Sequence, residues 1–236
     1  MKMQIKWKLK QRSLKMNIKI RSSQVSKIMP GVRKSWLKGT EDYLRELYIS
    51  KKYGREREIS SKYMSKGTIV EDHSMELLSL LESKFYVKNE ENFENDWITG
   101  TPDIIEPELR DIKSSWDIFT FHKTLAEGIT DDNFWQAQSY MDLTGSDICY
   151  IDYCLVDTPE QLVEYEKRKI IYDAQTDDPE WYRRKCKTIE KKMKYNDIPM
   201  EERKKTFEVK RDEEKINLIH ERVELCREWV DKNLIE

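Results

Sequence analysis

Two carboxylates and a lysine within one short stretch form the part of the chain best suited to chemistry. Pro102 fixes its own φ, so Asp103 is expected at a turn or a strand start. Side chains alternate along a strand, so Asp111 and Lys113 share one face. The Ile112 side chain then points into the core, and its carbonyl oxygen lies close to both Asp111 and Lys113. Such a group suits Mg²⁺, which takes oxygen ligands and is usually completed by waters and phosphate oxygens. The corresponding chemistry is metal-assisted phosphodiester hydrolysis.

A Gly-x-x-x-Glu motif lies upstream of this stretch. Gly67 and Glu71 are one turn apart on one face of a helix predicted over about residues 61–84. A glycine there lets backbone or substrate approach closely and leaves Glu71 to face the metal. Glu76 and Glu82 compete for this role, and the glycine spacing favours Glu71. An exposed helix glutamate is the alternative interpretation.

A Gln-x-x-x-Tyr motif lies downstream. Gln136 and Tyr140 fall on one face of a helix that is predicted to begin near Asp131 and to end at Gly145. The alternative is a polar helix face with a half-buried tyrosine.

In this order and spacing, the three motifs resemble the signature of the PD-(D/E)xK nucleases, in the form found in phage-type nucleases related to lambda exonuclease and to the YqaJ and RecB-like branch. The matching positions span residues 21–140, and the likeness beyond them is one of helical layout. The resemblance implies an α/β fold with a restriction-endonuclease-like core, in which a small mixed β-sheet is flanked by helices and followed by a helical C-terminal part.

The resemblance also implies a metal site. Asp103, Asp111 and the carbonyl of Ile112 would hold Mg²⁺, with Mn²⁺ as a substitute, and Glu71 would complete that site or a second one. Lys113 would orient the attacking water or offset charge on the transition state.

The remaining catalytic positions come from the downstream motif, because Gln136 and Tyr140 would position the water and the DNA backbone. Trp116 follows the catalytic lysine closely, and it either stacks on DNA bases or packs internally. Phe119 and Phe121 are expected in the core.

A candidate DNA-end site precedes these motifs. Ser22 and Ser23 stand before a short helical run that ends at Pro30, and a serine there is a good N-cap. A helix N-terminus attracts anions, and Arg21 stands beside it. The segment resembles the helix start at which lambda exonuclease holds a 5′-phosphate. Ser23 matches best, whereas Arg21 is close to the family's arginine but not aligned with it. The alternative is an ordinary cap with a surface arginine.

Composition limits the class of protein. The 236 residues predict a single domain over 1–236, with a basic arm at 1–20 and a mostly helical part at 158–236. Net charge is −2, yet no acidic residue precedes Glu41, so the arm either follows a phosphate backbone or is a solvated tail.

No apolar run approaches the roughly 20 residues of a membrane span, so no membrane association is expected. The N-terminus lacks the features of a secretory signal, which predicts a cytoplasmic protein in a bacterial or phage-infected host cell.

The four cysteines all lie downstream of the predicted catalytic motifs, without a Cys-x-x-Cys pair. Some RecB-like nucleases place one cluster cysteine upstream, so an iron–sulfur cluster is not expected. Cys149 and Cys154 lie in an apolar run and are predicted to be core thiols.

Elsewhere the pattern predicts a hairpin of strands at 85–87 and 93–99, a strand at 147–157, helices at 159–175 and 179–194, an edge strand at 205–211 and a final helix at 212–233. That helix is expected to bury Leu225 among other apolar residues.

The predicted function is a phage-type exonuclease that acts on linear duplex DNA in recombination, alongside a single-strand annealing protein and as a candidate homo-oligomer. The alternatives are a structure- or sequence-specific endonuclease and a non-catalytic DNA-binding module.

Overall fold

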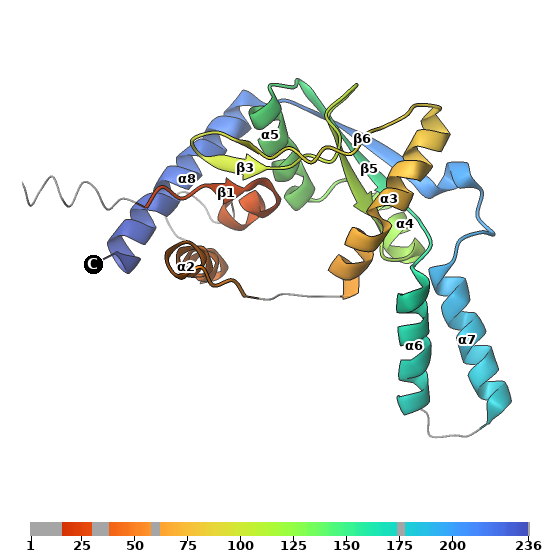
Figure 1. Ribbon diagram of the computed structural model, residues 1–236. Helices are drawn as coiled ribbons and strands as arrows, with labels where there is room; N and C mark the ends of the chain where they lie inside the picture. The colour runs from red at the N-terminus through yellow and green to blue at the C-terminus, as the bar shows by residue number, and fades with distance from the viewer. Residues whose placement is uncertain (1–15, 30–37, 58–61, 174–177, 236) are drawn as a thin grey trace, which may run out of the picture.

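Two small mixed sheets form the centre of the protein, and helices flank them (Figure 1). The computed structural model describes residues 16–29, 38–57, 62–173 and 178–235, without the side chains of 62–68 and 173. Most of the predicted basic arm therefore lies outside the described residues. The predicted α/β class with a helical C-terminal part is confirmed, and the single mixed sheet of the prediction is divided in two.

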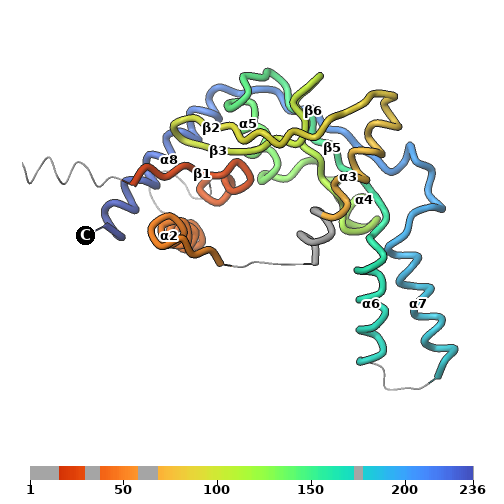
Figure 2. Tube along the Cα trace, viewed as in Figure 1, coloured from red at the N-terminus to blue at the C-terminus, as the bar shows by residue number. Residues whose placement is uncertain are grey.

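The first sheet has the strand order β1-β3-β2. Strand β3 (Ile98–Gly100) lies parallel to β1 (Ile20–Arg21) and antiparallel to β2 (Phe93–Glu94). The predicted hairpin is therefore formed by β2 and β3 alone, and the trace in Figure 2 shows these two segments side by side. The strand predicted at 85–87 is absent, because Tyr86 turns inward instead and its hydroxyl donates to Glu82 at 2.6 Å.

The second sheet carries the candidate chemistry and has the strand order β4-β5-β6. Strand β4 (Arg110–Ser114) lies parallel to β5 (Ile148–Cys154), and β6 (Lys204–Lys210) lies antiparallel to β5 at the edge, as predicted. β5 is rich in β-branched and aromatic residues, which suit a buried strand. Its Cys149 and Cys154 are fully buried, which confirms their prediction as core thiols.

Helices cover both sheets. In chain order they are η1 (Ser22–Ile28), α2 (Lys38–Tyr53), α3 (Lys62–Glu82), α4 (Ile118–Glu127), α5 (Asp131–Thr144), α6 (Glu160–Asp173), α7 (Pro179–Met193), η2 (Met200–Arg203) and α8 (Glu213–Leu234). Helix α5 ends as predicted, because Gly145 adopts a left-handed φ of 74°. Helices α6 and α7 form an antiparallel pair that projects from the body of the molecule (Figure 1). No helix among the described residues combines the length and the apolar character that crossing a membrane requires.

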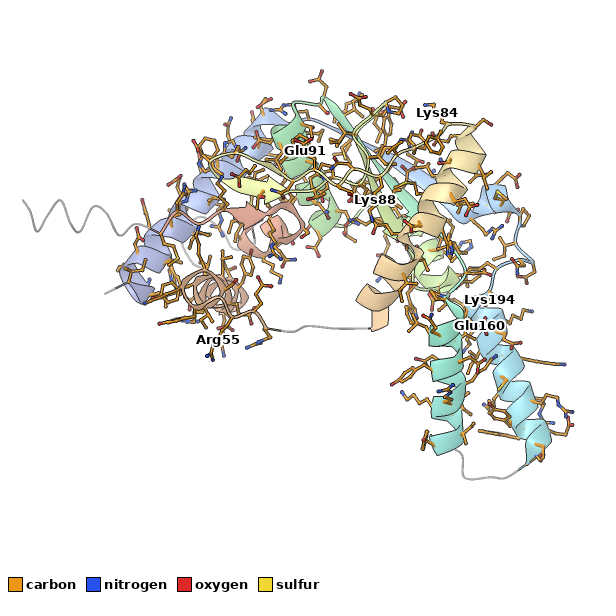
Figure 3. All side chains as sticks on the ribbon, in the orientation of Figure 1. Arg55, Lys84, Lys88, Glu91, Glu160 and Lys194 are labelled. Carbon is orange, nitrogen blue, oxygen red and sulfur yellow. The ribbon has the colours of Figure 1, made fainter. Side chains whose placement is uncertain are left out.

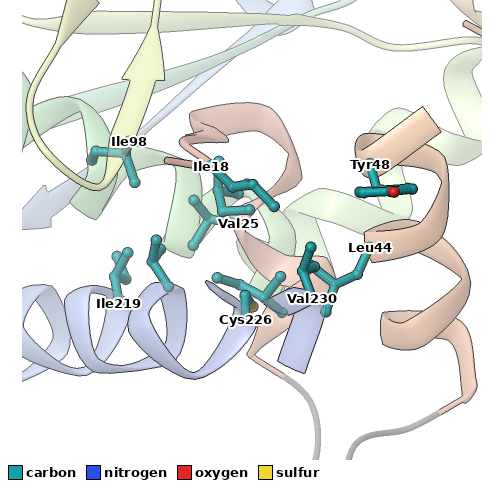
Figure 4. Close-up of a cluster of buried hydrophobic side chains, with 11 residues drawn as sticks. Ile18, Val25, Leu44, Tyr48, Ile98, Ile219, Cys226 and Val230 are labelled. Carbon is teal, nitrogen blue, oxygen red and sulfur yellow. The ribbon is translucent and has the colours of Figure 1, made fainter. Parts of the chain in front are cut away.

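Three hydrophobic clusters hold these layers together. Figure 4 shows the first, in which η1, α2 and α8 pack around Val25, Leu44 and Val230. The second joins α5 to the second sheet and includes Tyr140, and the third packs α3 against the same sheet through Leu78 and Ile112. The sheet that carries the candidate residues is therefore fixed on both faces by α5 and α3.

Helix α4 was not predicted from the sequence. The Asp117 side chain caps it by accepting a hydrogen bond from the Thr120 amide at 2.8 Å. The helix turns Phe121 into the core, with 1% of its surface exposed, but leaves Phe119 69% exposed. The prediction that Phe119 is a core residue is therefore wrong, and so is that for Leu225, which is 40% exposed on α8.

Candidate active site

Strand β4 places a carboxylate and an ammonium group side by side. Asp111 is buried, with 1% of its surface exposed, and its Oδ2 lies 2.8 Å from Lys113 Nζ. These residues are two positions apart on the strand, so their side chains leave the same face of the sheet, as predicted. The intervening Ile112 points the opposite way, into the cluster beneath α3.

Asp103 reaches the same strand from a preceding loop. Ile104 and Arg110 form an antiparallel bridge, which folds residues 103–111 back on themselves. Asp103 Oδ2 consequently accepts a hydrogen bond from the Ile112 amide at 2.6 Å. In a strand, the N–H and C=O of one residue point to the same edge, so the carbonyl of Ile112 faces the edge at which Asp103 lies.

These groups provide the oxygen donors that a hard cation requires. Oδ2 of Asp111 is buried and accepts no hydrogen bond from the described residues, although the Lys113 ammonium group lies nearby. A buried carboxylate oxygen that is paired with one ammonium group and accepts no further hydrogen bond can also act as a metal ligand. The donor set is small, because no group of three or more His, Cys, Asp or Glu side chains within the described part of the chain is arranged to hold a metal. A cation bound between Asp103 and Asp111 would therefore depend on waters or substrate oxygens for the rest of its shell.

Glu71 does not contact these two carboxylates in the structure. Its side chain is 25% exposed and forms an ion pair of 3.0 Å with Lys88, a residue that the sequence interpretation did not single out (Figure 3). Its charge nevertheless reaches the site, because it contributes to raising the pKa values of both Asp103 and Asp111. Gly67 lies on the same helix α3, and its surroundings fall outside the described side chains.

The two competing glutamates on α3 are positioned for other contacts. Glu76 lines a separate cavity of about 570 Å³ on the outer side of the helix. Glu82 binds the guanidinium of Arg110 at 2.9 Å and also pairs with Lys204. Arg110 in turn lies 2.8 Å from the fully buried Asp152, so this network fastens the C-terminal end of α3 to β4 and β5.

The downstream motif closes over the site from α5. Gln136 Oε1 accepts a hydrogen bond from Lys113 Nζ at 3.1 Å, and its Nε2 donates to the Tyr140 hydroxyl at 2.9 Å. Nε2 also lies 3.4 Å from Asp111 Oδ1. The Tyr140 hydroxyl donates to the carbonyl of Thr101 at 3.2 Å, close to the loop that carries Asp103. The structure thus joins the two motifs, which are separated by more than twenty residues, in one hydrogen-bonded group.

Burial controls the protonation of this group. It raises the pKa of Asp103 to about 7, with a further contribution from the neighbouring Asp111 charge. Burial also raises the pKa of Asp111, although the Lys113 ammonium group opposes the change. For Lys113 burial acts against the charged form, but the Asp111 carboxylate outweighs it and raises the pKa of the lysine. A divalent cation would offset the negative charge of two desolvated carboxylates that share one lysine.

The candidate DNA-end segment differs from its prediction in one respect. Arg21 occupies the N-cap position of η1, which is a 3₁₀ helix, and no side chain caps it. Ser22 is buried, and its hydroxyl donates to the carbonyl of Thr99 at 3.3 Å. The prediction of a serine N-cap is therefore wrong, because the long-range contact to β3 engages the Ser22 hydroxyl. Arg21 and Ser23 are exposed, and Arg21 lies 3.5 Å from Glu56.

Gly100 explains how this segment meets α5. A Cβ at Gly100 would lie 2.5 Å from Ser22 Oγ and 2.9 Å from Tyr140 Cε1. The backbone, η1 and the tyrosine ring therefore approach one another more closely than any other residue type would allow. In the sequence, the one sign of this close approach is the glycine that directly follows a strand pattern.

Trp116 lies at the end of β4, partly buried. It lines a cavity of about 200 Å³ together with Glu166 and Lys192 from the projecting helices. The structure thus places it between the candidate site and the α6–α7 pair.

Comparison with known proteins supports the predicted class. No family model and no curated protein matches the chain. Among solved structures, a phage-related exonuclease from Haemophilus somnus 129PT is 26% identical, with a TM-score of 0.71 over 92% of this chain and 95% of that one. An alkaline exonuclease, LHK-Exo, from Laribacter hongkongensis is 15% identical, with a TM-score of 0.63 over 94% and 92%. Its complex with dAMP is 17% identical, with a TM-score of 0.59 over 91% and 92%.

The fold is that of phage-related exonucleases, and Asp111 and Lys113 on one face of β4, with Asp103 beside them, match the predicted resemblance to the PD-(D/E)xK nucleases. Within that superfamily, the similarity over nearly the full length of the Haemophilus somnus protein confirms the predicted resemblance to the phage-type exonucleases.

Proposed function

We propose that the chain is a phage-type exonuclease that hydrolyses phosphodiester bonds of linear duplex DNA with the help of Mg²⁺. One observation carries the proposal: Asp103, Asp111, Lys113 and Gln136 converge on the edge of β4 in a chain whose fold is shared with phage-related and alkaline exonucleases. The structural relatives favour an exonuclease over the endonuclease alternative. The intact carboxylate and lysine set favours catalysis over a purely DNA-binding module.

The residues have distinct roles in this proposal. Asp103, Asp111 and the Ile112 carbonyl would hold the cation, with Mn²⁺ as a substitute for Mg²⁺. Bound there, the cation would polarise the scissile phosphate and lower the pKa of a bound water. Lys113 is already charged and fixed by Asp111, so it is suited to orient a water or to offset negative charge on the phosphate as it reacts.

Gln136 and Tyr140 would position the reacting groups. The side-chain oxygen of Gln136 accepts a hydrogen bond from the Lys113 ammonium group. The side-chain nitrogen of Gln136 donates a hydrogen bond to the Tyr140 hydroxyl. Loss of the first contact would leave Lys113 bound to Asp111 alone, and loss of the second would loosen the Gln136 side chain. Both are therefore expected to contribute through orientation.

Two further features belong to this proposal. Arg21 and Ser23, exposed at the start of η1, would bind the terminal 5′-phosphate of the DNA. We also infer a role in recombination with a single-strand annealing protein and a homo-oligomeric working form. The cytoplasm of a bacterial or phage-infected host cell is the expected location, because the DNA substrate lies there.

Digestion of DNA substrates tests the proposal directly. End-labelled linear duplex and covalently closed circular duplex would be incubated with the protein in Mg²⁺, Mn²⁺ or EDTA. We expect the linear substrate alone to be degraded, and only with a metal. The Asp111→Asn variant should abolish cleavage while it still binds DNA in Ca²⁺, and Asp147→Asn, a change of an exposed carboxylate beside the same sheet, serves as the matched control. Cleavage of the circle would instead favour the endonuclease, and cleavage by Asp111→Asn near the parental rate would refute the site.

A further inference from the structure

A second site candidate lies at the base of the α6–α7 pair. A cavity of about 540 Å³ opens between the start of α4 and the end of α7, and its apolar wall includes Ile118, Phe119, Tyr195 and Ile198. Tyr195 is 1% exposed and, with Ile118 and Ile198, belongs to the same hydrophobic cluster as Tyr140. The wall of this cavity is therefore joined by direct packing to the core behind the candidate active site.

The base of the α6–α7 pair is firmly attached to the body. Lys194 and Glu160 form an ion pair of 3.1 Å where the two helices meet the body (Figure 3). The Thr158 amide donates to the carbonyl of Met193 at 2.8 Å, which joins the segment before α6 to the end of α7. A ligand bound here would meet a surface that is already formed.

The rim of the cavity is basic. Lys187, Lys191 and Lys192 line it and are exposed, and none of them forms an ion pair with another described residue. Lys187 and Lys191 lie one turn apart, so their ammonium groups project from one side of α7. Asp197 is the one acidic residue that lines the cavity among the residues that the structure describes. Three cations against one carboxylate favour a ligand with negative charge.

The cavity also exposes an aromatic ring. Phe119 is 69% exposed, whereas Phe121, two residues further along α4, is buried. Phe119 and the three lysines line the same cavity. Such a ring offers a stacking face for a nucleic acid base, while the lysines meet the phosphates.

Two neighbouring cavities extend this surface along α7. Both share Lys192 with the first, and one of them, of about 200 Å³, is lined by Trp116, three residues after the catalytic Lys113. The other, of about 370 Å³, is lined by Trp181, whose ring lies 5.6 Å from the Lys185 ammonium group. Each of the three cavities is therefore lined by at least one aromatic ring and by Lys192, and the smallest is also lined by Asp117 and Glu166.

We propose that this α7 surface, defined by Phe119, Lys187, Lys191 and Lys192, binds a single-stranded segment of DNA, with an unpaired base against Phe119 and phosphates on the lysines. The proposal rests on the proposed nuclease function for its choice of DNA. A single strand is favoured over a duplex because stacked, paired bases hide the faces that a ring in a pocket would contact. The segment would be the strand that becomes unpaired while its complement is degraded.

Binding measurements without catalysis test this proposal. Fluorescence anisotropy with labelled oligo-dT and with a duplex hairpin of equal phosphate number would be recorded in EDTA. Phe119→Ala should weaken oligo-dT binding about ten-fold and leave duplex binding almost unchanged. Lys187→Ala combined with Lys191→Ala should reduce the slope of log affinity against log salt concentration by about 1.4 for oligo-dT, which corresponds to two lost phosphate contacts.

A matched control is available in a separate cavity at the C-terminal end of α3. Phe85 is 88% exposed in the cavity that Asp72, Glu76 and Lys84 line, so Phe85→Ala removes a ring that is at least as accessible from a cavity with more acidic than basic residues. It should change neither affinity. Because Phe119 and the lysines are exposed, all variants are expected to retain the parental melting temperature, which circular dichroism would check.

Several outcomes would overturn the proposal. These are an unchanged oligo-dT affinity in Phe119→Ala, an equal loss for the duplex, or an equal effect of Phe85→Ala. Displacement of oligo-dT by polyglutamate of matched charge, without dependence on Phe119, would identify an acidic protein surface as the ligand instead. The test is independent of cleavage: if the chain lacks nuclease activity but Phe119→Ala selectively weakens oligo-dT binding, the proposed function fails and the α7 surface stands.

Discussion

Gln136 Oε1 accepts a hydrogen bond from Lys113 Nζ at 3.1 Å and so connects helix α5 to strand β4 across the candidate active site. The lysine is also bound to Asp111 at 2.8 Å, which means that its ammonium group is held from two elements at once. A side chain with four rotatable bonds gains a fixed direction in this way.

The first prediction concerns this contact. Gln136→Ala should lower the cleavage rate about ten-fold to a hundred-fold, because it removes a hydrogen bond to a charged group, worth roughly 1.5–3 kcal/mol. Single-turnover digestion of end-labelled duplex would measure the rate. Gln138→Ala is the matched control, because Gln138 is buried on the same helix but bonds Lys210 and Asp212 instead. That variant should lose stability while it keeps the parental rate in its folded fraction. Equal rate losses in Gln136→Ala and Gln138→Ala would contradict a specific role of Gln136 in the candidate active site.

The second prediction concerns competition between a lysine and the metal. If Glu71 helps to bind Mg²⁺, its ion pair with Lys88 must open first. Lys88→Met should therefore lower the Mg²⁺ concentration for half-maximal rate, and Glu71→Gln should raise it. The effect of Lys88→Met should be a few-fold at most, because exposed pairs contribute about 0–1 kcal/mol. Asp72→Asn, which changes the neighbouring exposed carboxylate, is the control. An unchanged metal dependence in both variants would return Glu71 to a purely surface role.

The third prediction uses the raised pKa of Asp103. In the metal-free protein this pKa is about 7, against an ordinary value of 3.8, because of burial and the charge of Asp111. The folded state therefore holds the proton more tightly than the unfolded state. The resulting stability is fully present below about pH 4 and is lost as the pH rises through 7.

Asp103→Asn should consequently raise the melting temperature of the metal-free protein at pH 8, by roughly 5 °C for a change on the order of 2 kcal/mol. The asparagine keeps an oxygen to accept the Ile112 amide hydrogen bond. The gain should be far smaller at pH 5. Melting curves in EDTA at both pH values would measure it, and Mg²⁺ should then stabilise the parental protein more than the variant. A gain of equal size at both pH values would contradict the raised pKa.

The fourth prediction concerns the DNA end. Linear duplex with a 5′-phosphate should be degraded at least about ten-fold faster than duplex with a 5′-hydroxyl, and Arg21→Ala should abolish that preference. Arg45→Ala is a suitable control, because Arg45 is an exposed arginine on the neighbouring α2 that pairs with Glu41 and Asp42. Equal rates on the two substrates would refute end binding and would favour the endonuclease alternative.

The sequence identified the residues whose relationship is local. Asp111 with Lys113, and Gln136 with Tyr140, follow from the periods of a strand and a helix, and the structure shows both pairs on common faces. The approach of these pairs to each other was implied by resemblance rather than by spacing. Their actual hydrogen bonds depend on how α5 packs on the sheet, which local periodicity does not encode.

The errors arise from individual side-chain contacts, most of them long-range. The hydroxyl of Ser22 binds Thr99, 77 residues further along the chain, in place of the expected helix cap. Lys88, which directly follows the strand predicted at 85–87, forms an ion pair with Glu71, and Asp117 caps a helix that the sequence pattern did not predict. In each case a tertiary contact or a single capping side chain decided the local structure, against a propensity worth only a few tenths of a kcal/mol to about 1 kcal/mol.

The close packing around Gly100 has a mechanical consequence. No methyl group fits between this residue, Ser22 and Tyr140, so the three cannot slide past one another without a collision of backbone and ring atoms. The segment that presents Arg21 and the helix that presents Gln136 are consequently in close contact through this glycine. If the start of η1 binds the DNA end as proposed, the protein itself sets the distance from that end to the phosphodiester bond at the candidate active site.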